Sequence, residues 1–133
     1  MSKLRQKGNR SVAKCTSILT SLGYRVENVE NTRRFAKQRD LFNLYDLIAI
    51  HKENPPCLIQ ITSNRPHVHK LYLEFAGDYA KHFCILQMVV VDRQGFIAYI
   101  YHSNNTKTIV DGRKISTQEF TEKLKVALQF PTN

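Results

Sequence analysis

The chain has 133 residues, of which 42% are hydrophobic, and it carries a formal net charge of +9 at pH 7. A chain of this length and composition supports one domain with a single modest core. No run of about 18 apolar residues is present, which excludes a membrane-spanning helix. The basic N-terminus leads into no apolar segment, which excludes a secretory signal. We therefore expect a single cytoplasmic domain over residues 1–133.

The three cysteines show no sign of a metal or redox site. They are far apart in the sequence, stand in apolar surroundings and show no C-x-x-C spacing. An odd number of such thiols indicates buried structural residues in a reducing compartment rather than a disulfide framework. We therefore expect Cys15, Cys57 and Cys84 to be buried and unbridged, in keeping with an intracellular location.

The positive charge is concentrated in the first third of the chain. Residues 1–39 hold ten Lys and Arg side chains and two acids, a net charge of +8, whereas the remaining residues carry +1. This distribution favours a surface that binds a polyanion, and we prefer nucleic acid to an anionic membrane or a merely solvated tail. The candidates for nucleic-acid contacts are Arg5, Lys7, Arg10, Lys14, Arg33, Arg34, Lys37 and Arg39.

Periodicity in the first half of the chain predicts a helix and then three strands. Apolar residues recur at helical spacing up to Leu22, and Gly23 follows where helices commonly end in the left-handed conformation. Two later apolar runs, separated by a turn with Pro55 and Pro56, are apolar on both faces and are typical of interior strands. The expected elements are a flexible basic arm at residues 1–8, a helix capped by Asn9 or Ser11 and ending at Leu22, a strand at 24–30, a basic connection at 31–39, and strands at 45–51 and 57–62.

The second half predicts a helix, further strands and a closing helix. A stripe of apolar residues marks the helix at 67–83, and we expect this stripe in the core. The almost wholly apolar run at 85–91 follows a helical crossover, so we expect a buried strand parallel to the one at 57–62. Ser116 and Glu119 form a capping box. The other expected elements are a turn at 92–95, a strand at 96–102, a short edge strand at 106–110 and a helix ending near 128, and the apolar stripe is Val68, Leu71, Tyr72, Phe75, Tyr79 and Phe83.

This order of elements defines the expected fold class. It is an α/β fold with a mixed central sheet flanked by helices. An α-β-β-β-α-β core is extended by an extra strand and a C-terminal helix. No internal repeat or low-complexity tract divides the chain, which again predicts one domain.

Polar residues interrupt the apolar strands expected at 45–51 and 57–62. A carboxylate such as Asp46 in a buried strand is unfavourable unless a metal ion, a cationic partner or an open cleft compensates it. In an even hairpin register Asp46 shares a face with Gln60 or Thr62, whereas an odd register puts them on opposite faces. The sequence leaves both registers open, and we prefer the even one because it gathers the polar groups into one site.

The element order and three short motifs resemble the PD-(D/E)xK nuclease superfamily. The motifs are Gly23-Tyr24-Arg25-Val26 after the first helix, Asp46 within LYDLIAI, and Gln60-Ile61-Thr62 within CLIQITS. The resembling part covers about residues 8–91. Within the superfamily the chain looks most like archaeal and phage Holliday junction resolvases and their uncharacterised relatives, which implies a restriction-endonuclease-like core.

The resemblance implies a metal-dependent endodeoxyribonuclease that hydrolyses DNA phosphodiesters. Asp46 would bind Mg²⁺ or Mn²⁺ directly, and Gln60 would offer its amide oxygen where the family usually has a carboxylate. The ion would polarise the phosphate and lower the pKa of a bound water for in-line attack. Because a four-way junction is two-fold symmetric, the expected assembly is a homodimer on branched DNA.

The chain departs from the family pattern at two places. Thr62 stands where the family has a lysine that stabilises developing charge, and Lys70 or Lys37 is expected to replace it. The first helix lacks the glutamate of many members, so Asp40 is a candidate second carboxylate, with a turn residue or a salt bridge as the alternative. The catalytic candidates are Asp46, Gln60, Thr62, Asp40 and Lys70, with Asp46 and Gln60 as the metal ligands.

The residues leave three functions open. The first is the nuclease. The second is a DNA-binding module of the same fold that has lost cleavage, in which Asp46 forms a structural ion pair and Gln60 is a buried, hydrogen-bonded amide. The third is a structural or assembly protein whose basic charge serves solubility alone.

Overall fold

In the computed structural model, residues 3–29, 42 and 44–129 are described, apart from the side chains of residues 3–9. The described residues form three helices and six strands, and the order of these elements confirms the predicted α/β fold class. The α-β-β-β-α-β core is extended by two strands, not one, before the last helix. The elements are α1 (Lys3–Ser21), β1 (Arg25–Asn28), β2 (Leu47–Ile50), β3 (Cys57–Ser63), α2 (His69–Tyr79), β4 (Cys84–Val91), β5 (Gly95–Tyr101), β6 (Lys107–Arg113) and α3 (Thr117–Gln129).

The six strands form one mixed sheet in the order β1-β2-β3-β4-β5-β6. β3 and β4 are parallel, as predicted, because α2 carries the chain back over the sheet between them. The other neighbouring pairs are antiparallel. β6 lies at one edge of the sheet, where the sequence predicts an edge strand, and β1 lies at the other edge.

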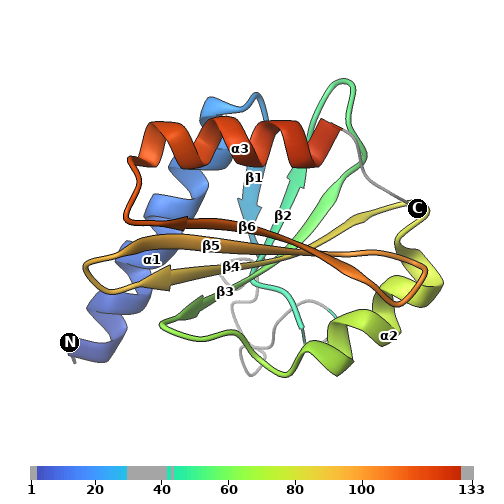
Figure 1. Ribbon diagram of the computed structural model, residues 1–133, viewed down its shortest axis with the longest axis horizontal. Helices are drawn as coiled ribbons and strands as arrows, with labels where there is room; N and C mark the ends of the chain where they lie inside the picture. Colours follow the sequence, from blue (N-terminus) through green and yellow to red (C-terminus); the bar gives the residue numbers. More distant parts are fainter. Residues whose placement is uncertain (1–2, 30–41, 43, 130–133) are drawn as a thin grey trace.

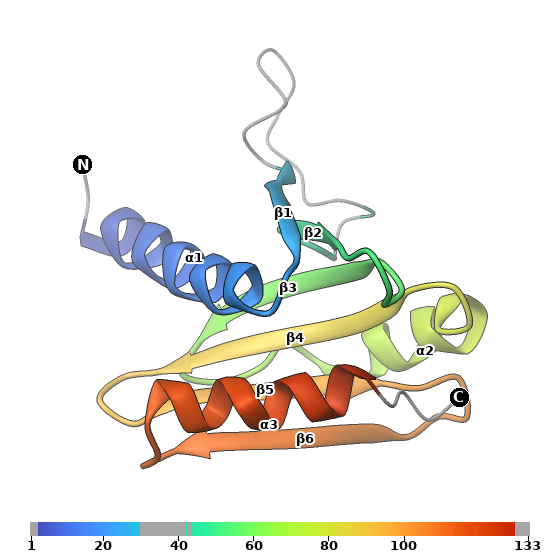
Figure 2. The ribbon, with the colours of Figure 1, turned by 90° about the horizontal axis from the view of Figure 1, so that it is seen from above.

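Helices cover both faces of this sheet. Figure 1 shows α3 above the sheet and α2 below it, and Figure 2, seen from above, shows α3 in front of the strands. Side chains from α1 and α3 share one buried cluster with the upper face, whereas side chains from α2 form a second cluster on the lower face. We call these the α1/α3 face and the α2 face.

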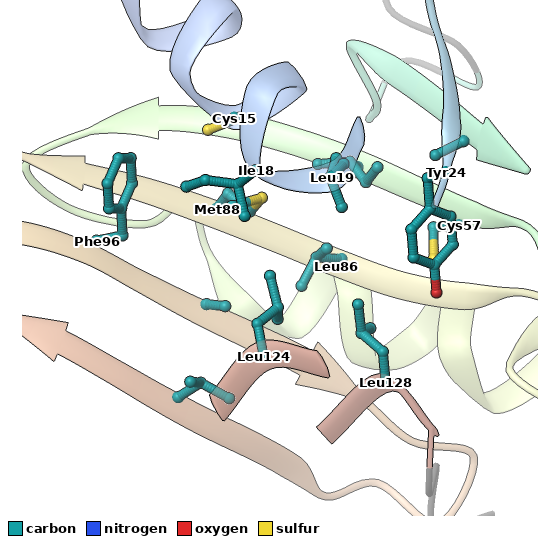
Figure 3. Close-up of a cluster of buried hydrophobic side chains, with 14 of the residues drawn as sticks. Cys15, Ile18, Leu19, Tyr24, Cys57, Leu86, Met88, Phe96, Leu124 and Leu128 are labelled. Carbon is teal, nitrogen blue, oxygen red and sulfur yellow. The ribbon is translucent and has the colours of Figure 1, made fainter. Parts of the chain in front are cut away.

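The larger core lies on the α1/α3 face. Figure 3 shows Ile18 and Leu19 of α1 and Leu124 and Leu128 of α3 packed over the strands. Cys15 belongs to the same cluster and is fully buried. Burial first, and then the negative charge of Asp46, raise the pKa of the Cys15 thiol to about 12. The cysteines of the described part are free thiols, which agrees with their predicted structural role.

Local signals place the end of α1 and the start of α3 where the sequence predicts them. Gly23 follows α1 with φ +93°, the left-handed conformation that glycine adopts without strain. The Tyr24 N–H donates to the Leu19 carbonyl at 3.1 Å, which closes the end of the helix. At the start of α3, the Glu119 N–H donates to Ser116 Oγ at 3.0 Å. Among the described residues, none of the helices has the length and apolar character needed to cross a bilayer.

Two helix predictions are wrong in detail. α1 begins at Lys3, so most of the predicted basic arm is helical; the residues before Gly8 are mainly good helix formers. The core stripe predicted for residues 67–83 is half right. Tyr72 is buried, and Phe75 and Phe83 pack against the cluster on the α2 face. Val68, Leu71 and Tyr79 are instead 67%, 49% and 46% exposed, and the unpredicted Ala76 is buried.

Candidate active site

Strands β2 and β3 adopt the even register. Leu47 is paired with Ile59, and Ile48 is paired with Leu58. Continuing this register by one residue puts the Asp46 position across from Gln60, which is the alternative that we preferred from the sequence. The backbone does not continue regularly, however, because Asp46 lies just before β2 begins.

A bulge interrupts the strand at Asp46. Tyr45 packs on the α2 face and Leu47 packs on the α1/α3 face, although a regular strand would put residues two apart on the same side. The Asp46 N–H donates to the Ile59 carbonyl at 2.9 Å, and Ile59 is also the partner of Leu47. Two consecutive residues therefore oppose one residue of β3, which is the defining geometry of a bulge.

The bulge turns the Asp46 carboxylate toward the backbone of β3. Asp46 Oδ2 accepts a hydrogen bond from the Ile61 N–H at 3.0 Å. The same carboxylate is close enough to the Cys15 thiol of α1 to help raise its pKa. Asp46 thus satisfies a β3 donor beyond the end of the β2 ladder, and its charge stands beside the strand that carries Gln60 and Thr62.

Gln60 and Thr62 project from the α2 face of β3 with unsatisfied oxygens. They are only 5% and 8% exposed. Within the described part of the chain, Gln60 Oε1 and Thr62 Oγ1 have no hydrogen-bond partner, and neither does the buried Tyr45 hydroxyl on the same face. A buried polar atom without a partner costs free energy and usually marks a bound water, a bound ion or a functional strain. Three such atoms on one face define the candidate site.

The neighbouring glutamine in the sheet is fully hydrogen-bonded. Gln87 of β4 is the register partner of Gln60 and is completely buried. Its Oε1 accepts from the His67 N–H at 3.0 Å, and its Nε2 donates to the His67 carbonyl at 3.3 Å and to the Tyr101 hydroxyl at 2.7 Å. The Tyr101 hydroxyl lies 2.7 Å from His69 Nδ1. We call Gln87, His67, Tyr101 and His69 the Gln87 network.

Two titratable members of the Gln87 network have shifted pKa values. Burial first, and then the positive charge of Lys107, lower the pKa of His69. Burial likewise raises the pKa of Tyr101. Both shifts favour the uncharged forms of His69 and Tyr101, whose hydrogen bond joins the start of α2 to the sheet.

Sequence reasoning missed two residues of this region, Gln87 and Tyr45. Gln87 interrupts the apolar run CILQMVVV just as Gln60 interrupts CLIQITS, so the same signal was available for it. Tyr45 carries no comparable signal, because a buried tyrosine ring is ordinary core material. Tyr101 packs flat against Tyr72 of α2, with ring centroids 5.4 Å apart, as part of the packing between helix and sheet.

The other predicted site residues are not brought to this site by any described contact. Lys70 is exposed in the first turn of α2, and no hydrogen bond or ion pair described for it reaches Asp46, Gln60 or Thr62. Arg10 and Lys14 are exposed on α1. Arg5 and Lys7 lie in α1, but their side chains are outside the described part of the structure. The whole segment that holds the other candidates is outside it too: Arg33, Arg34, Lys37, Arg39 and Asp40.

The described side chains offer oxygen ligands but few charges. No group of three or more His, Cys, Asp or Glu residues able to hold a metal ion occurs in the described part of the chain. The unsatisfied oxygens of Gln60 and Thr62, and the carboxylate of Asp46, are nevertheless of the type that Mg²⁺ and Mn²⁺ prefer. The donors therefore fit a hard divalent cation in kind.

Comparison with known proteins gives structural similarity but no sequence match. No protein-family model matches the sequence, and no curated protein matches it significantly. The structure is similar to that of Hjc, a Holliday junction resolvase from the archaeal hyperthermophile Archaeoglobus fulgidus, with a TM-score of 0.46 and 11% sequence identity. The similarity covers 69% of this chain and 75% of that chain. An alignment at this level assigns no function and no site residue, so the proposal below depends on the residues of this chain alone.

Proposed function

We propose that the protein is a divalent-cation-dependent endodeoxyribonuclease that acts on branched DNA, as a Holliday junction resolvase or another structure-selective nuclease. The observation that carries the proposal is the pair of buried oxygens on Gln60 and Thr62 that have no hydrogen-bond partner in the described part of the chain. The Asp46 carboxylate accepts from the N–H of Ile61, the residue between them. A fold stabilised only by packing gains nothing from burying these oxygens. A cation or an ordered water held there would satisfy them.

In this proposal each residue has a separate task. Asp46 supplies the negative charge that attracts a cation to the end of β2. Gln60 and Thr62 supply neutral oxygens from β3, and their burial keeps bulk water from competing for the ion. Mg²⁺ or Mn²⁺, when bound, would polarise a phosphodiester and lower the pKa of a water molecule. Lys70 stays a candidate for stabilising the developing charge, and Asp40 stays a candidate for a second carboxylate.

A second candidate function is DNA binding without cleavage. It is favoured by the hydrogen bond from the Ile61 N–H to Asp46, which gives the carboxylate a structural role. Thr62 also provides no positive charge where the resembling family has lysine. In this case the basic residues of α1 would still bind phosphates, and affinity would fall steeply with salt.

Cleavage of a synthetic four-way junction separates the two candidates. The purified protein is incubated with the junction, or with linear duplex of the same sequence, in Mg²⁺, in Mn²⁺ or in EDTA. The nuclease predicts metal-dependent cuts in the junction that disappear in the Asp46→Asn variant. This variant keeps an oxygen to accept from the Ile61 N–H while it removes the charge, so loss of cutting is not loss of fold.

The matched control is Asp111→Asn, which removes an exposed carboxylate paired with Arg113 at 2.8 Å on β6. This control should cut like the wild type. Binding without cuts in any metal would support the binding module, and retained cutting in Asp46→Asn would exclude the site proposed here.

The homodimer also belongs to this proposal. A two-fold symmetric enzyme would present two sites to a two-fold symmetric junction. Val68, Leu71 and Tyr79 leave exposed apolar surface on α2, and such surface is typical of contacts between subunits. Light scattering of the purified protein tests this, and Leu71→Glu should convert a dimer into a monomer.

A further inference from the structure

A long groove crosses the α1/α3 face, on the opposite side of the sheet from the candidate active site. One cavity of about 390 Å³ lies between α1, the turn that joins β4 to β5, and the start of α3. A second cavity of about 480 Å³ lies between the later turns of α1 and α3. Both are lined by Ser17, Ile18 and Thr117, so they form one continuous depression. We call it the α1–α3 groove.

The walls of the α1–α3 groove are polar and its floor is apolar. Ile18, which lines both cavities, is buried, and Figure 3 shows it beside Leu124 between the two helices and the sheet. Side chains one helical turn apart form each wall. The walls consist of Lys14, Ser17 and Ser21 on α1 and of Thr117, Thr121 and Lys125 on α3, and Arg93 and Gln94 stand at the end formed by the β4–β5 turn.

Positive charge dominates the lining. Lys14, Arg93 and Lys125 face a single acid, Glu122. None of the three cations takes part in an ion pair in the described part of the chain. The described ion pairs engage Arg113 and Lys123, which lie outside the groove.

We infer that the α1–α3 groove binds the phosphates of one nucleic-acid strand. Lysine, arginine and hydroxyl side chains are the usual donors to phosphate oxygens. Thr117 and Lys125 are eight residues apart on α3, a distance of about 12 Å at 1.5 Å per residue. The rise of about 3.4 Å per nucleotide is measured along the duplex axis, and successive phosphates of one strand lie farther apart than this, so a groove of this length spans about two of them.

This inference rests on the proposed function, because the groove would hold a second segment of the nucleic acid bound at the α2 face. It concerns binding alone and requires no cleavage. The two proposals can therefore fail separately. Arg93 and Lys125 add contacts that the basic N-terminal third of the sequence does not include.

Salt-dependent binding tests the groove directly. Fluorescence anisotropy of labelled single-stranded and duplex DNA is measured in EDTA between 50 and 200 mM salt. Each lost phosphate contact lowers the slope of log affinity against log salt by about 0.7 for a single strand. Arg93→Gln with Lys125→Gln should therefore reduce the single-strand slope by about 1.4. The matched control, Lys52→Gln with Lys81→Gln, removes the same charge at exposed positions outside the groove and should leave the slope unchanged.

Each outcome decides the inference. Strand binding in the groove would be overturned by an unchanged salt slope in the groove variant, or by an equal drop in the groove and control variants. It would also be overturned if the wild-type protein bound no DNA at about 50 mM salt. A reduced slope in a protein that never cleaves would overturn the nuclease and leave the groove. Amide NMR shifts at Ser17 and Thr117 that saturate with inorganic phosphate, while the DNA slope is unaffected, would assign the groove to free phosphate and overturn strand binding.

Discussion

Two buried glutamines lie side by side on the α2 face but differ in their hydrogen bonding. Gln87 of β4 makes three hydrogen bonds, to both backbone groups of His67 and to the Tyr101 hydroxyl. Gln60 of β3, its register partner, leaves Oε1 without a partner at 5% exposure. One side chain completes a hydrogen-bonded network, and the other presents an unsatisfied acceptor.

The contrast distinguishes a structural polar group from a functional one. A buried group with all its partners contributes to stability, and its removal leaves other buried groups unpaired. A buried group without partners costs stability and persists where something other than folding requires it. The α2 face thus has a structural part around Gln87 and a candidate functional part around Gln60 and Thr62.

The largest expected effect is on stability, in Gln87→Met. Methionine has a similar volume but cannot accept from the His67 N–H or donate to the Tyr101 hydroxyl. We expect the free energy of unfolding to fall by about 2 to 3 kcal/mol, since buried groups lose their partners. Urea denaturation followed by circular dichroism measures this loss. A change below about 0.5 kcal/mol would mean that the Gln87 network contributes little to the fold.

Next in size is the effect of Gln60→Glu on cation affinity. A carboxylate replaces the neutral oxygen of Gln60, and hard divalent cations bind carboxylates more tightly than amides. We expect Mg²⁺ affinity to rise at least about tenfold, which corresponds to about 1.4 kcal/mol. Isothermal titration calorimetry measures the affinity, and Gln118→Glu is the control because it adds the same charge at an exposed position on α3. Equal Mg²⁺ affinity in wild type and Gln60→Glu would place the metal elsewhere.

Gln60→Met should have a smaller effect on stability, in contrast to Gln87→Met. It removes an unpartnered buried oxygen without creating a cavity, so unfolding free energy should stay within about 1 kcal/mol of the wild type or rise. Junction cleavage, by contrast, should be lost. A destabilisation as large as that of Gln87→Met would show that Gln60 is structural, and the comparison of the two glutamines would then fail.

Much of the fold could be predicted from the sequence because it follows from local periodicity. The parallel pairing of β3 and β4 was predictable because an apolar strand follows a helical crossover. The Ser116 cap was predictable from its spacing to Glu119. The bulge at Asp46 was not predictable, since the alternation of side chains along a strand does not show from the sequence where one extra residue is inserted. The contact face of α2 was predicted only in part: Tyr72 was included, but the buried Ala76 was missed because alanine gives a weaker hydrophobic signal than the exposed Leu71.

The candidate site could be predicted only in part, for a different reason. Gln60 and Gln87 look alike in the sequence, each a glutamine in an apolar strand. Their difference arises from His67 and Tyr101, which are 20 and 14 residues from Gln87 and reach it through the fold. Long-range partners of this kind decide whether a buried polar group is satisfied, and no local pattern contains them.

The smallest expected effect concerns the pH dependence of the Gln87 network. Burial and Lys107 lower the pKa of His69 below 6.5, so the unfolded chain binds a proton more readily than the folded one. The stability from neutral His69 is therefore complete above pH 6.5 and is lost as the pH falls toward the lower pKa of the folded state. Lys107→Met removes a repelling charge and should raise the His69 midpoint, followed by NMR of the imidazole carbons, toward 6.5. Lys52→Met should leave the midpoint unchanged. A wild-type midpoint at or above 6.5 would mean that the fold does not favour the neutral imidazole, and neutral His69 would then contribute nothing to stability.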